Sequence, residues 1–391
     1  MKVLILANKS TGLYKFRGEL LEALISKGHE VFISVPNGDF IDEMQQMGCH
    51  FIETEISRHG TNPLTDLALT KKYCSIIKSV KPDIVFTYTI KPNVYGGIAC
   101  QLCKVPYVAN VTGLGTAVEN GGILQKITLT LYRTGLRKAK RVFFQNQANL
   151  DFMFRHKVVK GAYSLLPGSG VNLERFAPLP YPDETDGIHF VFISRIMREK
   201  GIEQYLEAAK HFKVAESAEA PDSRHSDPCR GEESSAVPKI TFHICGFCEP
   251  EYKGKLDEYI KKGIVIYHGM VRDVREIHKI SHCTIHPSFY PEGLSNVLLE
   301  SCASARPIIT TDRSGCKEVV DDGVNGYVVK QCDSDDLILK IEKFLALTHE
   351  QKMQMGFAGR AKVEREFNRQ IVIDAYLKEA YNEPDSFSLG C

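Results

Sequence analysis

Short runs of β-branched and aromatic residues alternate with amphipathic helical patterns along almost the whole chain. In the first half, strand-like runs occupy 2–7, 30–35, 50–54, 83–88, 107–111, 141–145 and 163–166. In the second half they recur at 189–194, 239–245, 264–268, 283–286, 307–311 and 326–329. Apolar strands separated by helices are typical of parallel sheets covered on both faces. The pattern predicts an α/β protein with two doubly wound, Rossmann-like lobes that face each other across a cleft.

Glycine and proline mark the boundary between these lobes. Residues 168–187 combine several glycines with a proline-rich stretch, which disfavours regular structure. We therefore predict an N-terminal domain at 1–168, an interdomain linker at 168–187 and a C-terminal domain at 188–366. A helix at 367–381 is expected to pack back toward the N-terminal domain.

Two segments have the composition of mobile chain. Residues 214–238 are rich in Ser, Glu, Pro and Asp and poor in apolar residues, so they predict a mobile surface insertion within the second lobe. Residues 382–391 predict a tail of the same kind.

Composition narrows the class of protein. Of the 391 residues 43% are hydrophobic and 25% charged, which is ordinary for a globular protein. The formal net charge of +1 gives no reason to expect a nucleic-acid partner. The longest apolar runs have the length of strands, and the chain enters its first strand without a signal-peptide pattern. We expect a cytoplasmic protein.

The chemistry of the second lobe collects at the carboxyl ends of its strands. Arg195 and Lys200 follow one strand, and together they can clamp a diphosphate. Gly246, and the segment around Val271, follow two further strands and leave room for a flat base against the backbone.

A fourth strand runs into the turn and helix at 288–300. Glu292 and Glu300 bracket this helix start, whose amides and dipole favour an anion. The alternative interpretation is an ordinary strand-to-helix connection with two solvated glutamates.

Three loops of the first lobe also leave the carboxyl ends of strands. Gly12 lies in the first loop, Lys91 in a second, and Thr112 with Gly113 in a third. Because such ends converge on one crevice, these residues are candidate substrate contacts. The alternatives are a plain strand-to-helix turn at Gly12 and a solvated surface lysine at Lys91.

Residues 121–141 interleave apolar and basic side chains. A cationic, half-apolar helix of this kind is a candidate for resting on an anionic membrane surface or meeting a lipid-linked substrate. The alternative is a core-facing helix with a solvated basic face.

The pattern Ser-Arg-x-x-x-Glu-Lys-Gly at 194–201, Gly246 after its strand, and the glutamates Glu292 and Glu300 eight positions apart resemble the donor-site signature of family 4 retaining glycosyltransferases of the GT-B fold. The resemblance extends from residue 1 to about 381. In the first lobe, Phe16-Arg17, Lys91-Pro92-Asn93 and 112–115 resemble bacterial enzymes of capsule, O-antigen or lipid-linked oligosaccharide synthesis.

This resemblance implies a role for each matching residue. Arg195 and Lys200 would hold the donor diphosphate and stabilise the charge that develops on it, while Glu300 would bind the ribose hydroxyls. Glu292 would reach the transferred sugar. The remaining donor contacts would come from the backbone at Gly246 and Val271 for the base, from Gly12, and from Gly293, Leu294, Ser295 and Asn296 for the sugar and phosphate.

The implied partners are a nucleotide-sugar donor, with UDP the expected nucleotide, and a glycan or polyprenyl-linked acceptor. Acceptor-side candidates are Arg17, Lys91, Thr112 and Gly113. The resemblance implies a retaining front-face reaction. If the helical segment 121–141 rests on the membrane, the reaction takes place at the inner face of the cell membrane. Two alternatives stay open, a nucleotide-sugar epimerase and a non-catalytic nucleotide-sugar-binding scaffold subunit.

No metal or other cofactor is predicted. Asp333-Ser334-Asp335 spells the Asp-x-Asp metal motif of the other major glycosyltransferase fold, but it directly precedes the helical pattern at 337–347, where Asp is a preferred cap. The C-x-x-C pairs at 100–103 and 245–248 admit a zinc or redox site. Buried apolar thiols are the favoured interpretation of both pairs.

Overall fold

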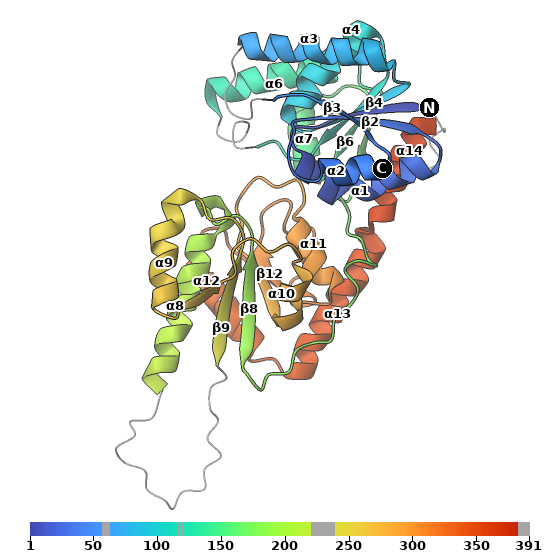
Figure 1. Cartoon of the computed structure of the whole chain (residues 1–391). Coiled ribbons are helices and arrows are strands. Elements are labelled where there is room, and N and C mark those ends of the chain that lie inside the picture. Colours follow the sequence, from blue (N-terminus) through green and yellow to red (C-terminus); the bar gives the residue numbers. More distant parts are fainter. Residues whose placement is uncertain (57–62, 116–117, 119–120, 220–238, 382–391) are drawn as a thin grey trace, which may run out of the picture. The chain divides into compact units, whose positions relative to one another are not determined.

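The structure is a computed structural model of the whole chain, and it describes residues 1–56, 63–115, 118, 121–219 and 239–381 (Figure 1). The chain forms two compact units. Unit 1 comprises Met1–Gly170, Pro291–Leu294 and Asn368–Cys391, and unit 2 comprises Val171–Tyr290 and Ser295–Phe367. The chain therefore leaves unit 2 for one short segment, Pro291–Leu294, before it crosses again at the C-terminal helix.

Unit 1 contains a seven-stranded sheet in the order β3-β2-β1-β4-β5-β6-β7, with every neighbouring pair parallel. Its strands are β1 (Lys2–Leu6), β2 (Glu30–Val35), β3 (His50–Glu53), β4 (Ile84–Tyr88), β5 (Tyr107–Val111), β6 (Arg141–Phe144) and β7 (Tyr163–Leu165). Its helices are α1 (Ser10–Ser26), α2 (Ile41–Gln46), α3 (Pro63–Val80), the π-helix η1 (Pro92–Gly96), α4 (Gly97–Cys103), α6 (Gly122–Leu136), α7 (Gln147–Arg155) and α14 (Arg369–Tyr381).

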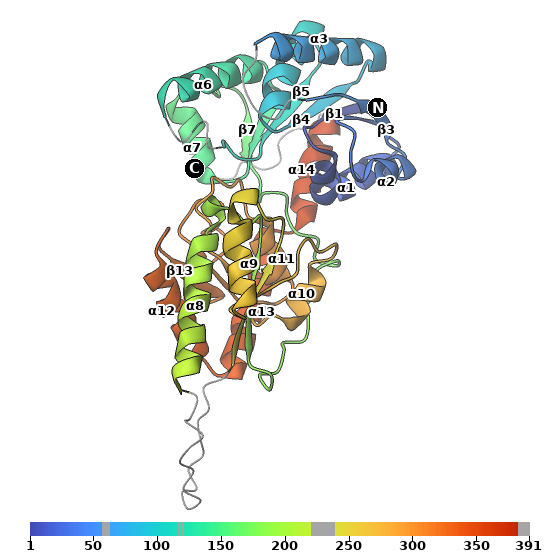
Figure 2. The same cartoon turned by 60° about the vertical axis from the view of Figure 1, so that its left-hand side comes forward.

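Side chains alternate across this sheet and divide its core in two. Val3 and Ile5 pack with apolar residues of α1, α2 and α14, whereas Leu4 and Leu6 pack with those of α3, α4, α6 and α7. Figures 1 and 2 show these helices on opposite faces of the sheet. Because both faces are covered, the central strands β1, β4 and β5 are almost entirely buried and largely apolar, which is the pattern that made them predictable.

The C-terminal helix α14 is part of unit 1. Tyr376 is 1% exposed, and its hydroxyl accepts a 2.6 Å hydrogen bond from the Asn110 amide at the end of β5. Arg369 donates 2.6 Å hydrogen bonds to both carboxylate oxygens of Glu19 on α1. Glu379 pairs with Lys140 and Arg141 beside β6. The chain's last helix therefore completes one face of the first sheet.

Unit 2 contains a six-stranded parallel sheet in the order β10-β9-β8-β11-β12-β13. Its strands are β8 (Ile188–Ile193), β9 (Ile240–Cys245), β10 (Val265–Tyr267), β11 (Cys283–His286), β12 (Ile308–Thr311) and β13 (Gly326–Val329). Its α-helices are α8 (Ile202–Glu219), α9 (Lys253–Lys261), α10 (Arg275–Ile280), α11 (Asn296–Ala303), α12 (Ser334–Leu345) and α13 (His349–Glu366), with short 3-10 turns η2 (Arg198–Lys200) and η3 (Pro250–Tyr252). The predicted strands are confirmed in both sheets.

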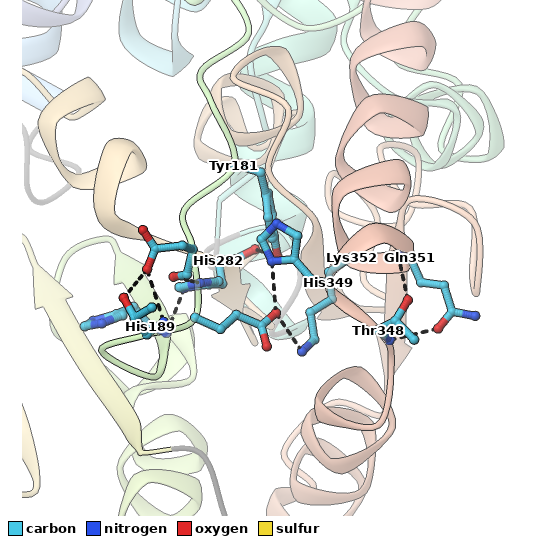
Figure 3. A network of polar contacts seen from close by, with 10 residues as sticks. Tyr181, His189, His282, Thr348, His349, Gln351 and Lys352 are labelled. Atoms are coloured by element: carbon cyan, nitrogen blue, oxygen red, sulfur yellow. Dashed lines mark hydrogen bonds and ion pairs between the residues drawn. The ribbon is translucent and has the colours of Figure 1, made fainter.

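The segment expected to be an interdomain linker is instead fixed along unit 2. Residues 171–187 lie in that unit, and the fully buried guanidinium of Arg306 donates hydrogen bonds to the carbonyls of Leu179 and Pro180. Tyr181 donates to the His282 carbonyl at 3.0 Å, as Figure 3 shows. The glycine and proline pattern therefore marks an irregular segment, residues 171–187, which we call the strap. The buried Arg306 side chain satisfies two of its carbonyls.

The predicted mobile insertion begins later than expected. Helix α8 runs to Glu219, so the prediction for residues 214–219 is wrong. The helix continues because 202–219 has few strong breakers, even though its last residues are polar. The remainder of that prediction, 220–238, and the predicted tail at 382–391 lie outside the described residues.

Three smaller expectations can be compared with the structure. The Asp333 carboxylate accepts a 2.9 Å bond from the Asp336 amide and caps α12, so the capping interpretation is confirmed. In the described part of the chain the cysteines are free, and burial raises the pKa of Cys245 to about 12. None of the described helices combines the length and apolar character that a membrane span requires.

Candidate functional site

Two cations meet over one aromatic ring at the carboxyl edge of the unit 2 sheet. Lys200 is 8% exposed, and its Nζ lies 4.8 Å from the centre of the Tyr290 ring. The Arg195 guanidinium carbon lies 5.8 Å from the same ring, and its Nη1 is 3.8 Å from Glu249. Cation–π contacts hold both charges at the ends of β8 and β11. The structure thus brings together the two residues that the sequence predicted as a diphosphate clamp.

A histidine close to Lys200 is held in its neutral form. His286, the last residue of β11, is buried, and burial together with the Lys200 charge lowers its pKa to about 3. A neutral imidazole at this position keeps the positive charge concentrated on Lys200.

Gly246 is required by close backbone packing. Its φ is +140°, and a Cβ at this position would lie 1.7 Å from the Ser194 carbonyl oxygen. The Gly246 amide donates to the Gly269 carbonyl at 2.8 Å, and the Tyr267 hydroxyl donates to the Gly246 carbonyl at 2.8 Å. The turns after β8, β9 and β10 are therefore in close backbone contact at Gly246. Val271, just beyond, packs in the small apolar cluster on this face of the sheet.

The N-terminus of α11 is suited to an anion. Its N-cap, Ser295, makes no side-chain capping bond, and the first turn carries no acidic residue. The free amides and the helix dipole therefore give the turn a positive potential. Asn296 begins this helix, and the half-buried Glu300 lies on it one turn further along.

The stretch 288–300, which the sequence analysis treats as one turn, is divided between the units. Glu292, Gly293 and Leu294 belong to unit 1. The Asn146 amide donates to the carbonyls of Glu292 at 3.0 Å and Gly293 at 2.5 Å, and a Cβ on Gly293 would lie 2.0 Å from the Thr112 carbonyl oxygen. The Asn146 hydrogen bonds thus bind this segment at the end of β6, and the close approach of Gly293 to Thr112 after β5 is one that only glycine permits.

The predicted acceptor-side residues Arg17, Lys91, Thr112 and Gly113, and the predicted donor contact Gly12, all belong to unit 1. Gly113 has a φ of +152° and follows Thr112 at the end of β5. Arg17 is 5% exposed, with its guanidinium carbon 5.3 Å from the centre of the Tyr88 ring. Lys91 forms a 2.9 Å ion pair with Asp66. Gly12 lies in the first turn of α1, and a Cβ there would meet no atom within 4 Å.

Sequence reasoning missed several residues of these clusters. The Tyr290 ring makes cation–π contacts with both cations. The Asn146 amide donates to the Glu292–Gly293 backbone, and Asp66 forms an ion pair with Lys91. Asn146 directly follows β6, so the strand-end rule could have found it. Asp66 and Tyr376 lie inside helices, and nothing local in the sequence distinguishes them from ordinary helix residues.

The described residues contain no group of three or more His, Cys, Asp or Glu side chains arranged to hold a metal ion. That the activity needs no divalent cation stays a prediction from the sequence.

Family profiles match both halves of the chain. Residues 180–362 match the family described as glycosyl transferases group 1, and residues 2–146 match the family described as glycosyl transferase 4-like. The chain is a glycosyltransferase with a glycosyl transferase 4-like N-terminal half and a group 1 C-terminal half. The two matches cover most of the chain and favour neither the epimerase nor the scaffold alternative.

Two curated relatives show the extent of the similarity. The N,N'-diacetylbacillosaminyl-diphospho-undecaprenol alpha-1,3-N-acetylgalactosaminyltransferase of Campylobacter jejuni is 24% identical over 97% of this chain and 98% of that protein. The UDP-Gal:alpha-D-GlcNAc-diphosphoundecaprenol alpha-1,3-galactosyltransferase of Escherichia coli is 24% identical over 67% of this chain and 66% of that protein.

A solved structure shows the fold. Anabaena Alr3699/HepE, crystallised in complex with UDP, superposes with a TM-score of 0.75 at 16% identity and covers 98% of this chain and all of that one. The glycosyltransferase therefore has the GT-B fold, as predicted.

Proposed function

We propose that this glycosyltransferase moves a hexose or N-acetylhexosamine from a UDP-sugar to a polyprenyl-diphosphate-linked glycan, with retention of configuration. The pair of cations over Tyr290 is the observation that carries the proposal, because it supplies fixed positive charge where a diphosphate leaving group needs it. The names of the two relatives support a lipid-diphosphate acceptor and an α-linked product.

The donor would bind in unit 2. Arg195 and Lys200 hold its diphosphate, the α11 N-terminus faces the phosphate and sugar, and Glu300 accepts hydrogen bonds from the ribose hydroxyls. The base lies against the backbone at Gly246 and Val271. Breaking the glycosyl–phosphate bond puts negative charge on the diphosphate, so cations already held in place stabilise the transition state more than the ground state.

The sugar-binding part of the proposal rests on the segment in unit 1. The resemblance assigns Glu292, Gly293 and Leu294 to the transferred sugar and Gly12 to the donor phosphates. In the proposed front-face route, a leaving phosphate oxygen takes the proton of the attacking acceptor hydroxyl, so no enzyme nucleophile is needed. Arg17, Lys91, Thr112 and Gly113 would lie on the acceptor side.

We place the enzyme at the inner surface of the cell membrane. Along α6, Ile123 is 78% exposed and Leu124 and Ile127 are each 45% exposed, while Lys126 and Arg133 are exposed on the same helix. An exposed apolar strip with basic neighbours suits an anionic bilayer that holds a lipid-linked acceptor. Sedimentation with vesicles containing anionic lipid tests this, with Ile123→Glu expected to reduce binding and vesicles of zwitterionic lipid as the control.

The transfer reaction is tested with purified protein, a panel of UDP-, GDP- and dTDP-sugars, and a short-chain polyprenyl-diphosphate glycan. A true donor should raise the melting temperature by mass action and yield an extended lipid-linked product with an α linkage by NMR. Conversion of the nucleotide-sugar into an epimer without acceptor, or an unchanged product yield in Lys200→Ala and Glu300→Ala, would contradict the proposal.

A further inference from the structure

A cavity of about 680 Å³ opens in unit 1 at the carboxyl ends of β3 and β4. Glu53 ends β3 and is followed by the lining residues Glu55 and Ile56, Lys91 follows β4, and the other lining residues lie in the first turns of α3. Doubly wound sheets bind ligands at this edge, and the volume falls within the range of small-molecule sites.

One polar group in the wall is fixed in position by its neighbours. Asp66 is 5% exposed, one carboxylate oxygen accepts a 2.9 Å bond from Lys91, and the other accepts a 2.7 Å bond from the Tyr95 hydroxyl. Burial, with the Asp66 carboxylate, raises the pKa of Tyr95, so the phenol stays a donor. A carboxylate has about four acceptor positions, so Asp66 keeps acceptor capacity for a ligand, and the Lys91 ammonium keeps donors.

The rest of the lining determines the class of ligand. Glu53 and Glu55 add two exposed carboxylates, so three carboxylates face the ammonium groups of Lys72 and Lys91. An excess of carboxylates repels a diphosphate. Among the described residues no group of three or more His, Cys, Asp or Glu side chains is arranged to hold a metal ion.

A sugar fits both kinds of wall. Each sugar hydroxyl can donate to a carboxylate and accept from an ammonium group. The C–H face of the sugar matches the apolar lining of Ile56, Ala68 and Leu69. An N-acetyl group would place its methyl on that apolar lining and its amide toward Asp66 or Lys91.

We propose that the cavity around the Asp66–Lys91 pair is the subsite for a neutral 2-acetamido sugar of the lipid-linked acceptor. This inference rests on the proposed function and extends it, because it identifies which sugar of the substrate unit 1 recognises and by which side chains. Asp66 contacts the sugar and holds Lys91, Tyr95 positions Asp66, and the apolar lining distinguishes an acetamido group from a hydroxyl.

Direct binding tests this without requiring turnover. The full chain is titrated with a short-chain polyprenyl-diphosphate carrying N-acetylglucosamine, with its glucose counterpart, and separately with UDP. We expect Asp66→Asn to weaken acetamido-sugar binding at least about tenfold, because hydrogen bonds to a charged group are lost. Ile56→Ser should reduce the preference for the acetamido over the hydroxyl sugar by about fourfold, the value of one methyl contact.

Two further variants separate this loss from misfolding. Ala68→Leu places two methyls into the cavity, keeps the Asp66 pair and should also weaken binding. Asp42→Asn, an acidic change on α2 outside the cavity lining, is the matched control and should bind like the parent chain. All variants should bind UDP equally.

Wild-type affinity in both Asp66→Asn and Ala68→Leu, or equal weakening of UDP binding, would overturn the subsite. The proposed function can fail separately: the acceptor would still bind in an Asp66-dependent way, but no sugar would be transferred. Conversely, transfer to acetamido and hydroxyl acceptors with equal KM would leave the reaction standing and refute the subsite.

Discussion

Four buried histidines on one side of the unit 2 sheet predict that acid will unfold this protein. The clearest is His282, which lies just before β11 in the polar network of Figure 3. Its Nδ1 accepts a 3.0 Å bond from the His189 amide, and its Nε2 donates to the Asp183 carbonyl at 3.1 Å. Protonation of Nδ1 would break the first bond, and burial lowers the pKa to about 4.

The magnitude follows from linkage. The folded pKa lies below the unfolded value, so the unfolded chain binds more protons, and stability is complete above about pH 6.5 and lost as the pH falls toward 4. For an unfolded pKa of about 6.5, His282 alone costs about 2 kcal/mol at pH 5 and about 3 kcal/mol at pH 4.

The other three histidines add to this cost. Burial also lowers the pKa of His243 to about 4 and of His278 and His286 to about 3. Together the four histidines remove about 8 kcal/mol at pH 5, which is comparable to the whole stability of a typical domain at about 5–15 kcal/mol.

Urea unfolding followed by circular dichroism at fixed ionic strength between pH 7.5 and 5 measures the effect. His282→Asn keeps an acceptor for the His189 amide but cannot titrate, so its stability should fall by about 2 kcal/mol less than the parent's between pH 7 and pH 5. His211→Asn, at a half-exposed position of α8, is the control and should keep the parent's pH dependence. The reasoning is refuted if His282→Asn loses as much stability as the parent chain over this range.

Four further outcomes are expected. Lys200→Ala should lower kcat by about 10²–10³-fold, as removal of a transition-state charge contact does, while Lys253→Ala, 73% exposed on α9, should not. Glu300→Gln should weaken UDP binding by calorimetry about tenfold or more, because the ribose loses a charged acceptor. Activity should survive treatment with a chelator, and loss that magnesium restores would contradict metal independence. Tyr376→Ala should destabilise unit 1 by about 3–5 kcal/mol, whereas Tyr376→Phe, which removes the hydroxyl that accepts from Asn110, should cost about 1 kcal/mol in urea unfolding.

The order of strands and helices was determined by the sequence alone. Both sheets are parallel, and their strands are short runs rich in β-branched and aromatic residues that can be recognised without tertiary information. The same locality explains why the Asp333 cap was predictable, because a cap joins residues three apart. Arg195 and Lys200 were predictable because they directly follow a recognisable strand, and ligands bind at the carboxyl ends of parallel strands.

Only the tertiary structure decided which distant residues share a surface. Asp66 holds Lys91 from 25 positions away, and Tyr376 reaches Asn110 from 266 positions away. Nor does a local pattern show that Pro291–Leu294 is bound in unit 1, or that the glycine- and proline-rich strap is fixed by Arg306. Local patterns record the backbone conformation and burial of each segment. Which buried polar groups satisfy one another depends on long-range packing, and that pairing shapes the proposed acceptor cavity.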